Sequence, residues 1–332
     1  MRKILALLCV TLLTICSITA AAALIPEPAL SLPTLPQQYL ETRFHSIQQA
    51  FEQRATLFLK GRPFQRWEMN KTRENILTEF DQLNEWRFHT WYVDPNAKTL
   101  IARMDFMVAQ ELLEKGLYKK PALLAFDYNQ TDGNYNASTV LLNGFKFLAL
   151  ESPTPQTLNN FFLLLQNHRV TQLVRLTGSS ENATELGTKY WGNKLKMNAQ
   201  NNETFLNIPQ PYNPSPYALY YYATDVWPEN HGVAAGELLK LIVKVRKNAD
   251  SNGLIACHST HGNGRTGTFI AGFLLLNEID RQIAAGTPKN GLDVSIEKIV
   301  MQLSLQRPYL VRKAEQYITL YKLLDLYVKN LK

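Results

Sequence analysis

The segment of this chain with the clearest potential for chemistry is 258–268, which reads His-Ser-Thr-His-Gly-Asn-Gly-Arg-Thr-Gly-Thr. Apolar residues precede it at 254–257 and follow it at 269–276, so the pattern predicts a strand, a tight glycine-containing loop and a helix. Such a loop directs backbone N–H groups and the start of a helix toward one point, where an anion can bind. The planar guanidinium of Arg265 can add two parallel hydrogen bonds to a phosphate. The segment therefore predicts a phosphate-binding loop.

The amino terminus has the pattern of a secretory signal peptide. Basic residues at positions 2 and 3 are followed by an apolar run at 4–18 and by small residues at 19–23. We therefore expect residues 1–23 to be a signal peptide and the protein to be exported, to a periplasm or to the medium. The apolar run is short for a membrane span and no later stretch is longer, so no stable membrane insertion is expected.

Composition narrows the function classes further. The formal net charge is +7, and loss of the signal peptide removes Arg2 and Lys3 but no acid, which leaves +5. A mildly basic surface suits an anionic ligand, whereas the absence of a dense Lys/Arg tract with interleaved aromatic residues argues against nucleic acid. Cys257 is the one cysteine outside the signal peptide, so no intrachain disulfide is expected in the exported protein.

The rest of the chain alternates between predicted strands and helices. Prolines between 24 and 36 indicate a linker, and apolar spacing predicts a helix at 37–60, so we treat 24–60 as a linker and N-terminal helix and 61–332 as the main domain. Strands are predicted at 170–176 and 254–258, and helices at 157–168, 232–248, 269–285, 294–305 and 309–331. This alternation predicts an α/β domain with the phosphate loop at the carboxyl end of a central strand.

Residues 258–267 closely resemble the signature of protein-tyrosine phosphatases, His-Cys-x-x-Gly-x-Gly-Arg-Thr-Gly, except that Ser259 stands where the family has its nucleophilic cysteine. Other segments resemble family motifs in the same order along the chain, namely 134–138, 146–157, 159–162, 172–177, 189–191, 306–311 and 315–317. The resemblance implies a central mixed sheet flanked by helices, with the phosphate loop between a central strand and a helix. It also implies a monomer that uses no cofactor or metal and that binds a phosphorylated ligand, either a phosphotyrosine protein or an inositol phosphate.

The resemblance also assigns roles to individual residues of the loop. It places phosphate binding at Ser259, Thr260, His261, Gly262, Asn263, Gly264 and Arg265, and catalysis at Ser259, Arg265 and Thr266 together with a carboxylic acid. A serine hydroxyl is far less acidic than a thiol and no adjacent base is evident in the sequence, so we expect Ser259 to be a poor nucleophile. Cys257 lies earlier on the same strand, and we expect it to be a buried core residue that cannot replace the missing thiol.

Two carboxylates are candidates for the general acid. Glu229 follows Trp227-Pro228, as the acid of the family follows its Trp-Pro pair, but one extra residue separates it from the next matching residues. Asp225 is the alternative, because related phosphatases of inositol phosphates carry their acid just before the Trp-Pro pair. A solvated loop position for both is the third reading.

Substrate-positioning residues depart from the family pattern. In 70–77, Arg73 stands where the resemblance places a tyrosine that stacks on the substrate ring, and Arg312 stands where a glutamine orients the hydrolytic water. Gln316 matches the family, and we assign it a positioning role.

Three functions are compatible with the sequence as a whole: a phosphate-binding pseudophosphatase, an active phosphomonoesterase carrying a substrate-trapping serine, and a non-enzymatic interaction module.

Overall fold

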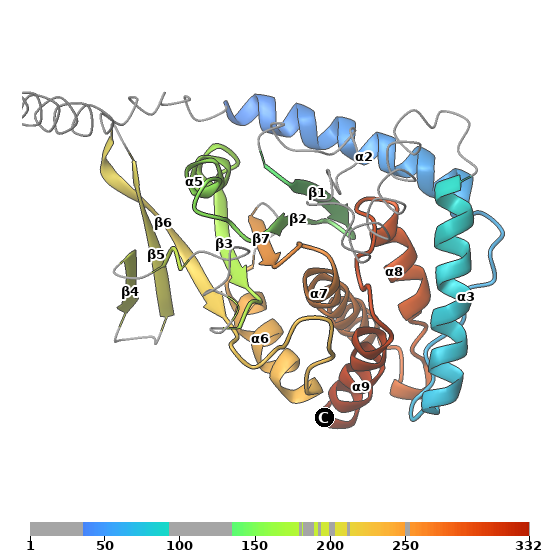
Figure 1. Cartoon of the computed structure of the whole chain (residues 1–332). Helices are drawn as coiled ribbons and strands as arrows, with labels where there is room; N and C mark the ends of the chain where they lie inside the picture. Colours follow the sequence, from blue (N-terminus) through green and yellow to red (C-terminus); the bar gives the residue numbers. More distant parts are fainter. Residues whose placement is uncertain are drawn as a thin grey trace, which may run out of the picture.

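The computed structural model describes residues 36–92, 135–178, 181, 189–191, 194–198, 203–210, 213–249 and 253–331. Figure 1 shows a twisted sheet with helices on both faces. In chain order the elements are α2 (Gln37–Leu59), α3 (Arg73–Tyr92), β1 (Ala137–Leu142), β2 (Phe145–Glu151), α5 (Leu158–Asn167), β3 (Val170–Arg175), β4 (Leu195–Asn198), β5 (Glu203–Gln210), β6 (Asn213–Ala223), α6 (Ala235–Lys247), β7 (Leu254–Ser259), α7 (Gly264–Ala284), the short 3-10 helix η3 (Lys289–Gly291), α8 (Ile296–Ser304) and α9 (Ala314–Asn330).

The sheet has the strand order β1-β2-β7-β3-β6-β5-β4. Strands β2, β7, β3 and β6 run parallel to one another, whereas β1, β5 and β4 join antiparallel at the two sides. The sheet is therefore mixed, as the family resemblance implied, and β7 lies between β2 and β3. That central position brings the carboxyl end of β7 and its loop next to the ends of two parallel neighbours, where α/β folds place their ligand sites.

Side chains of the central strands alternate between two apolar layers. On β7, Ile255 and Cys257 join the core shared with α7, whereas Leu254 and Ala256 join the core beneath α5. Figure 1 shows α5 on one face of the sheet and α6 and α7 on the other. Cys257 is fully buried, as the sequence analysis expected, and burial raises the pKa of its thiol, so it stays protonated.

The predicted elements are confirmed with shifts at their ends. The helix predicted at 37–60 is α2, and its Phe51 belongs to the main core. The helix predicted at 269–285 is α7, which begins earlier, at Gly264 within the loop motif. A Cβ atom at position 267 would lie 2.3 Å from the backbone nitrogen of Val311, so close packing against the segment before α9 requires glycine in the first turn. Glycine has a low helix propensity, so Gly264 and Gly267 by themselves disfavour a helix that starts here.

Helix α3 differs from the sequence interpretation. The sequence analysis predicts no helix over 70–92, where Arg73 is expected at a substrate-positioning position, but Arg73 is the first residue of a helix that continues to Tyr92. The signal-peptide expectation at 1–23 and the proline-rich linker up to residue 35 lie outside the described residues. Within the described ranges, no helix combines the length and the apolarity that a bilayer crossing requires.

Candidate functional site

The phosphate loop connects β7 to α7, and its shape depends on Gly262. This residue has a φ of +68°, and a Cβ atom there would lie 2.2 Å from the carbonyl oxygen of Leu150 on β2. Glycine is thus required both for the left-handed backbone and for the close approach. On the same side, the backbone N–H of Ser152 donates to the carbonyl oxygen of Ser259 over 2.9 Å, so the loop begins firmly attached to the end of β2.

The buried guanidinium of Arg307 supports the loop from behind. It donates to the carbonyl oxygens of Gly262 and His261, over 2.9 and 3.2 Å, and to Ser138 and Asn136 at the start of β1, each over 3.0 Å. Burial lowers the pKa of Arg307 to about 10, so it remains charged at neutral pH. Because these carbonyl oxygens are held on the far side, the start of α7 is free to present its first N–H groups to a ligand.

Arg265 lies in the first turn of α7, and its guanidinium is held by several partners. Its Nη1 and Nη2 donate to the two carboxylate oxygens of Glu181, each over 2.7 Å, and Nη2 also donates to Thr260 Oγ1 over 2.7 Å. Nη1 donates further to the carbonyl oxygen of Trp227 over 2.8 Å. The hydrogen bonds from Arg265, its charge and the Thr260 hydroxyl lower the pKa of Glu181 against the opposing effect of burial, so the pair is ionic. The guanidinium is thereby preorganised for an anion above the loop.

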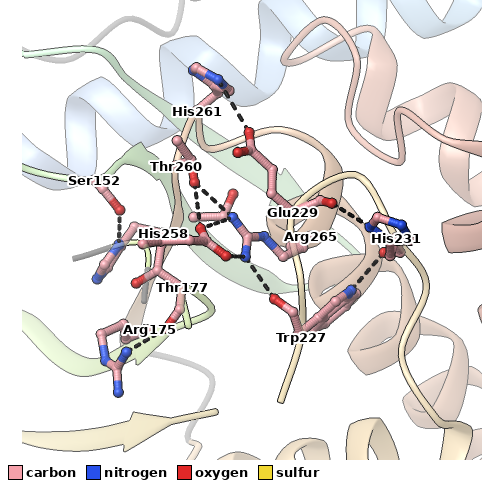
Figure 2. Close-up of polar contacts among 12 residues, drawn as sticks. Ser152, Arg175, Thr177, Trp227, Glu229, His231, His258, Thr260, His261 and Arg265 are labelled. Carbon is pink, nitrogen blue, oxygen red and sulfur yellow. Dashed lines mark hydrogen bonds and ion pairs between the residues drawn. The ribbon is translucent and has the colours of Figure 1, made fainter. Parts of the chain in front are cut away.

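The hydroxyl of Ser259 has no partner that could activate it. Its Oγ lies 3.0 Å from Thr266 Oγ1, the hydroxyl that follows Arg265 in the loop motif. Both ring nitrogens of its neighbour His258 have other partners. Nδ1 lies 2.9 Å from Ser152 Oγ (Figure 2), and Nε2 lies 2.6 Å from the Tyr190 hydroxyl. In the described part of the chain, no carboxylate or imidazole forms a hydrogen bond with Ser259 Oγ, so no general base is available to it.

Burial lowers the pKa of His258 to about 3. The charges of Arg175 and Arg265 contribute to this lowering, so the imidazole is neutral at any pH well above that value. Its two hydrogen bonds join the strand before the phosphate loop to Ser152 and Tyr190, on the side of the sheet covered by α5. His258 is therefore a neutral structural link rather than an acid or a base.

Glu229 lies over the phosphate loop, on the loop between β6 and α6. Its Oε1 lies 3.3 Å from His261 Nε2. The hydrogen bond to His261, together with the charges of His261, Arg265 and Arg312, lowers the pKa of Glu229 against the opposing effect of burial. The extra residue in this loop is accommodated at Asn230, which adopts a φ of +60°, a conformation that asparagine tolerates better than most residues. Glu229 therefore faces the loop as an ionised carboxylate.

Asp225, the rival acid, is held elsewhere. Its Oδ1 accepts a hydrogen bond from Arg175 Nη2 over 2.8 Å. Arg175 in turn donates to the Tyr221 hydroxyl over 2.8 Å and stacks on the ring of Trp191, with 4.2 Å between the guanidinium carbon and the ring centroid. Asp225 is not among the residues that line the pocket above the phosphate loop. Of the two candidate acids, Glu229 is the one that the structure brings to the loop.

The pocket above the loop is narrow, and it unites most of the residues predicted for the site. It is lined by Glu229, Asn230, Ser259, Thr260, His261, Asn263, Gly264, Arg265, Arg312 and Gln316. Gln316 is buried at the base of α9, and its Oε1 accepts from the N–H groups of Arg312 and Lys313, each over 3.1 Å. This side chain shapes the segment that carries Arg312.

Arg73 does not line this pocket. Its exposed guanidinium pairs with Glu315 at the start of α9, because Arg73 opens helix α3 rather than a substrate loop. Helix α3 also supports the segment before α9 from below, since Arg87 donates to the carbonyl oxygens of Leu310 and Val311 over 2.7 and 3.1 Å. Helix α3 therefore supports the wall of the pocket above the phosphate loop, although Arg73 does not line that pocket.

Sequence reasoning missed Glu181. It lies in a polar stretch with no periodic pattern and no motif, so nothing local marks it, and only the tertiary contact with Arg265 identifies it. Among the described residues, no group of histidine, cysteine, aspartate and glutamate side chains is arranged to hold a metal ion.

Comparison with known proteins identifies the family. The model of the protein-tyrosine phosphatase family (Y_phosphatase) matches residues 122–325. The chain belongs to this family. The matched region includes the phosphate loop, Glu229 and the segment from Arg307 to Gln316, whereas α2 and α3 precede it.

Relatives and solved structures agree with this assignment. The chain is 28% identical to human tyrosine-protein phosphatase non-receptor type 7 over 222 residues, 61% of this chain and 59% of that protein. It is 27% identical to the tyrosine-protein phosphatase corkscrew of Drosophila virilis, over 58% of this chain and 28% of that one. The chain thus spans under two thirds of the length of these relatives.

The protein tyrosine phosphatases TbPTP1 of Trypanosoma brucei and TcPTP1 of Trypanosoma cruzi share the fold. TbPTP1 has a TM-score of 0.56 at 22% identity, over 76% of this chain and 90% of that one. TcPTP1 has a TM-score of 0.55 at 20% identity, over 77% and 91%. At these identities, the likeness concerns the fold alone.

The neutral His258 of this phosphatase domain predicts a pH dependence of stability. The unfolded chain binds a proton on this histidine below about pH 6.5 and the folded chain does not until about pH 3, so stability falls as pH decreases through that window. Between pH 7 and pH 5, urea unfolding of the wild type should lose about 2 kcal/mol more than that of His258→Gln, which keeps a hydrogen-bonding side chain without a titration. Equal losses in the two proteins would show that His258 titrates normally in the folded state.

Proposed function

We propose that this protein is an exported pseudophosphatase, which binds a phosphorylated ligand in its phosphate loop and hydrolyses it poorly or not at all. The observation that carries the proposal is the contrast around Ser259. The loop presents Arg265 and the N-terminal N–H groups of α7 in an ordered arrangement, while among the described side chains the Ser259 hydroxyl hydrogen-bonds only to the Thr266 hydroxyl. Phosphate binding requires only Arg265 and the N–H groups of α7. Hydrolysis would also require an activated nucleophile at position 259.

Phosphate binding is supported by groups that do not depend on the nucleophile. The N–H groups at the start of α7 lack acceptors within the helix, and the helix dipole favours an anion at that end. Arg265 adds a buried positive charge beside them, and Arg312 adds another at the wall of the pocket. These features are together a phosphate site whether or not position 259 carries a thiol.

Weak chemistry is supported at two further positions. The lowered pKa of Glu229 opposes its use as a proton donor near neutral pH, because a general acid must be protonated before it reacts. Arg312 stands where the family resemblance places the glutamine that orients water, so the hydrolytic step is altered as well. Loss of the thiol is therefore accompanied by changes in the residues that serve the same reaction.

The ligand we favour is a phosphotyrosine protein, by analogy with the relatives named tyrosine-protein phosphatases. An inositol phosphate is the second candidate, and Arg312 is the observation that supports it. A guanidinium in the pocket wall suits a ligand with more than one anionic group, and Arg73 provides no aromatic surface for a tyrosine ring.

Oxyanion binding tests the site directly. Calorimetry with tungstate should show saturable binding to the wild type and a decrease in affinity of about 10- to 100-fold in Arg265→Ala, since a charge-assisted contact is lost. Arg281→Ala is the matched control, because Arg281 lies on the same helix but is exposed and pairs with Glu278. Equal binding by the wild type and Arg265→Ala, with both proteins folded by urea titration, would contradict the assignment.

Restoration of the nucleophile tests the chemical half. Ser259→Cys should hydrolyse phenyl phosphate measurably at mildly acidic pH, where a thiolate and a protonated acid coexist.

In that background, Glu229→Gln should lower turnover by roughly 10²-fold or more, whereas Asp225→Asn should change it little because Arg175 holds Asp225 away from the pocket. A larger loss in Asp225→Asn would reverse the roles of the two acids, and an inert Ser259→Cys would place the defect beyond the nucleophile.

The exported location rests on residues 1–23. The full-length chain expressed in a secreting host should be recovered without these residues, and N-terminal sequencing should show cleavage after Ala22 or Ala23. Recovery of the uncleaved chain in the cytosol would exclude export by this route.

A further inference from the structure

Glu229 creates an electrostatic difficulty in a phosphate site. It lines the same narrow pocket as Ser259 and Arg265, and its lowered pKa keeps it ionised. A phosphate group bound above the loop carries up to two negative charges, and like charges at such short range repel strongly where water is partly excluded. Arg265 attracts the phosphate, but part of its charge is offset by Glu181, which pairs with both of its terminal nitrogens.

His261 is placed to remove this difficulty. It lies on the phosphate loop itself, and its Nε2 is 3.3 Å from Glu229 Oε1. The two side chains are similarly exposed, at 35% and 34%, so the pair is accessible to protons from solvent while partly shielded. Its backbone carbonyl accepts from the buried Arg307, so the imidazole is anchored to the rigid part of the loop.

The Glu229 loop is closed by a circuit of contacts that starts and ends on the phosphate loop (Figure 2). His261 contacts the Glu229 carboxylate, and His231 Nδ1 lies 2.6 Å from the Glu229 carbonyl oxygen. Trp227 Nε1 donates to the His231 carbonyl oxygen over 2.8 Å, and the Trp227 carbonyl oxygen accepts from Arg265 over 2.8 Å. His261 and Arg265 thus each attach the Glu229 loop to the phosphate-loop segment.

We propose that His261 is a positioning residue that supplies the positive charge allowing Glu229 to stay over the phosphate loop when a phosphate is bound. The inference rests on the proposed phosphate-binding function and specifies how the site tolerates its own carboxylate. The imidazole lies on the phosphate loop and contacts the Glu229 carboxylate, so a positive charge on it would offset both that carboxylate and a bound dianion. The groups facing Glu229 in this arrangement are His261, Arg265 and Arg312.

A double-mutant cycle tests the inference, with tungstate affinity measured by calorimetry for the wild type, His261→Ala, Glu229→Gln and the double variant. His261→Ala should weaken binding by about fivefold, because Glu229 then loses one of the basic groups that face it beside the anion. The double variant should bind as well as Glu229→Gln alone, because the charge that His261 offsets is then absent. His261→Lys should restore most of the lost affinity.

Other outcomes separate the two proposals. An equal loss on His261→Ala with and without the Glu229 carboxylate would overturn the inference, since His261 would then act on the anion or on the loop fold by itself. Unchanged binding in His261→Ala would overturn it as well. Absence of tungstate binding in the wild type would instead overturn the proposed phosphate-binding function, on which the inference depends.

Discussion

The structure around the site depends on how the carbonyl oxygens of the phosphate loop are held away from the ligand. A loop that presents N–H groups to an anion must place carbonyl oxygens on its other side, and buried carbonyl oxygens need donors. Arg307 provides them, with Gly262 and His261 as acceptors and with Ser138 and Asn136 fixing the guanidinium to β1. The positive φ of Gly262 and the close approach of the Leu150 backbone help to fix the same loop conformation. Without this support, neither Arg265 nor the start of α7 would have a defined direction.

Charge within the pocket follows from this scaffold. Two basic side chains near the ligand position lie beside carboxylates, Arg265 beside Glu181 and His261 beside Glu229. A neutral serine in place of an ionised thiol removes one negative charge from beneath the anion, which reduces repulsion toward a phosphate dianion. The same replacement removes the nucleophile. Under the proposed function, this single position shifts the balance of the site from turnover toward binding.

Local patterns in the sequence predicted the elements that form continuous segments. The strand at 254–258, the glycine loop and the following helix could be recognised because their signals lie within one stretch, and the ordered family motifs predicted the mixed sheet around them. Contacts between distant segments could not be predicted in this way. Glu181 meets Arg265 across 84 positions, and the sequence around it carries no signal. The pairing of His261 with Glu229 likewise depends on how the longer loop folds back over the phosphate loop.

Helix α3 shows why a short motif can mislead. Residues 70–77 contain an Asn-x-x-Arg-x-Asn-Ile-Leu pattern that resembles a family motif. The apolar residues Ile76, Phe80 and Leu83 are nevertheless spaced as on one face of a helix, and they pack into the main core. Burial of that apolar face favours a helix here. Inside the core, the carboxylate of Glu79 accepts hydrogen bonds from the hydroxyls of Tyr317 and Tyr321 on α9. Since α9 begins at the pocket, α3 helps to set the position of the wall that carries Arg312 and Gln316. Its influence on the ligand is therefore exerted through packing rather than through contact.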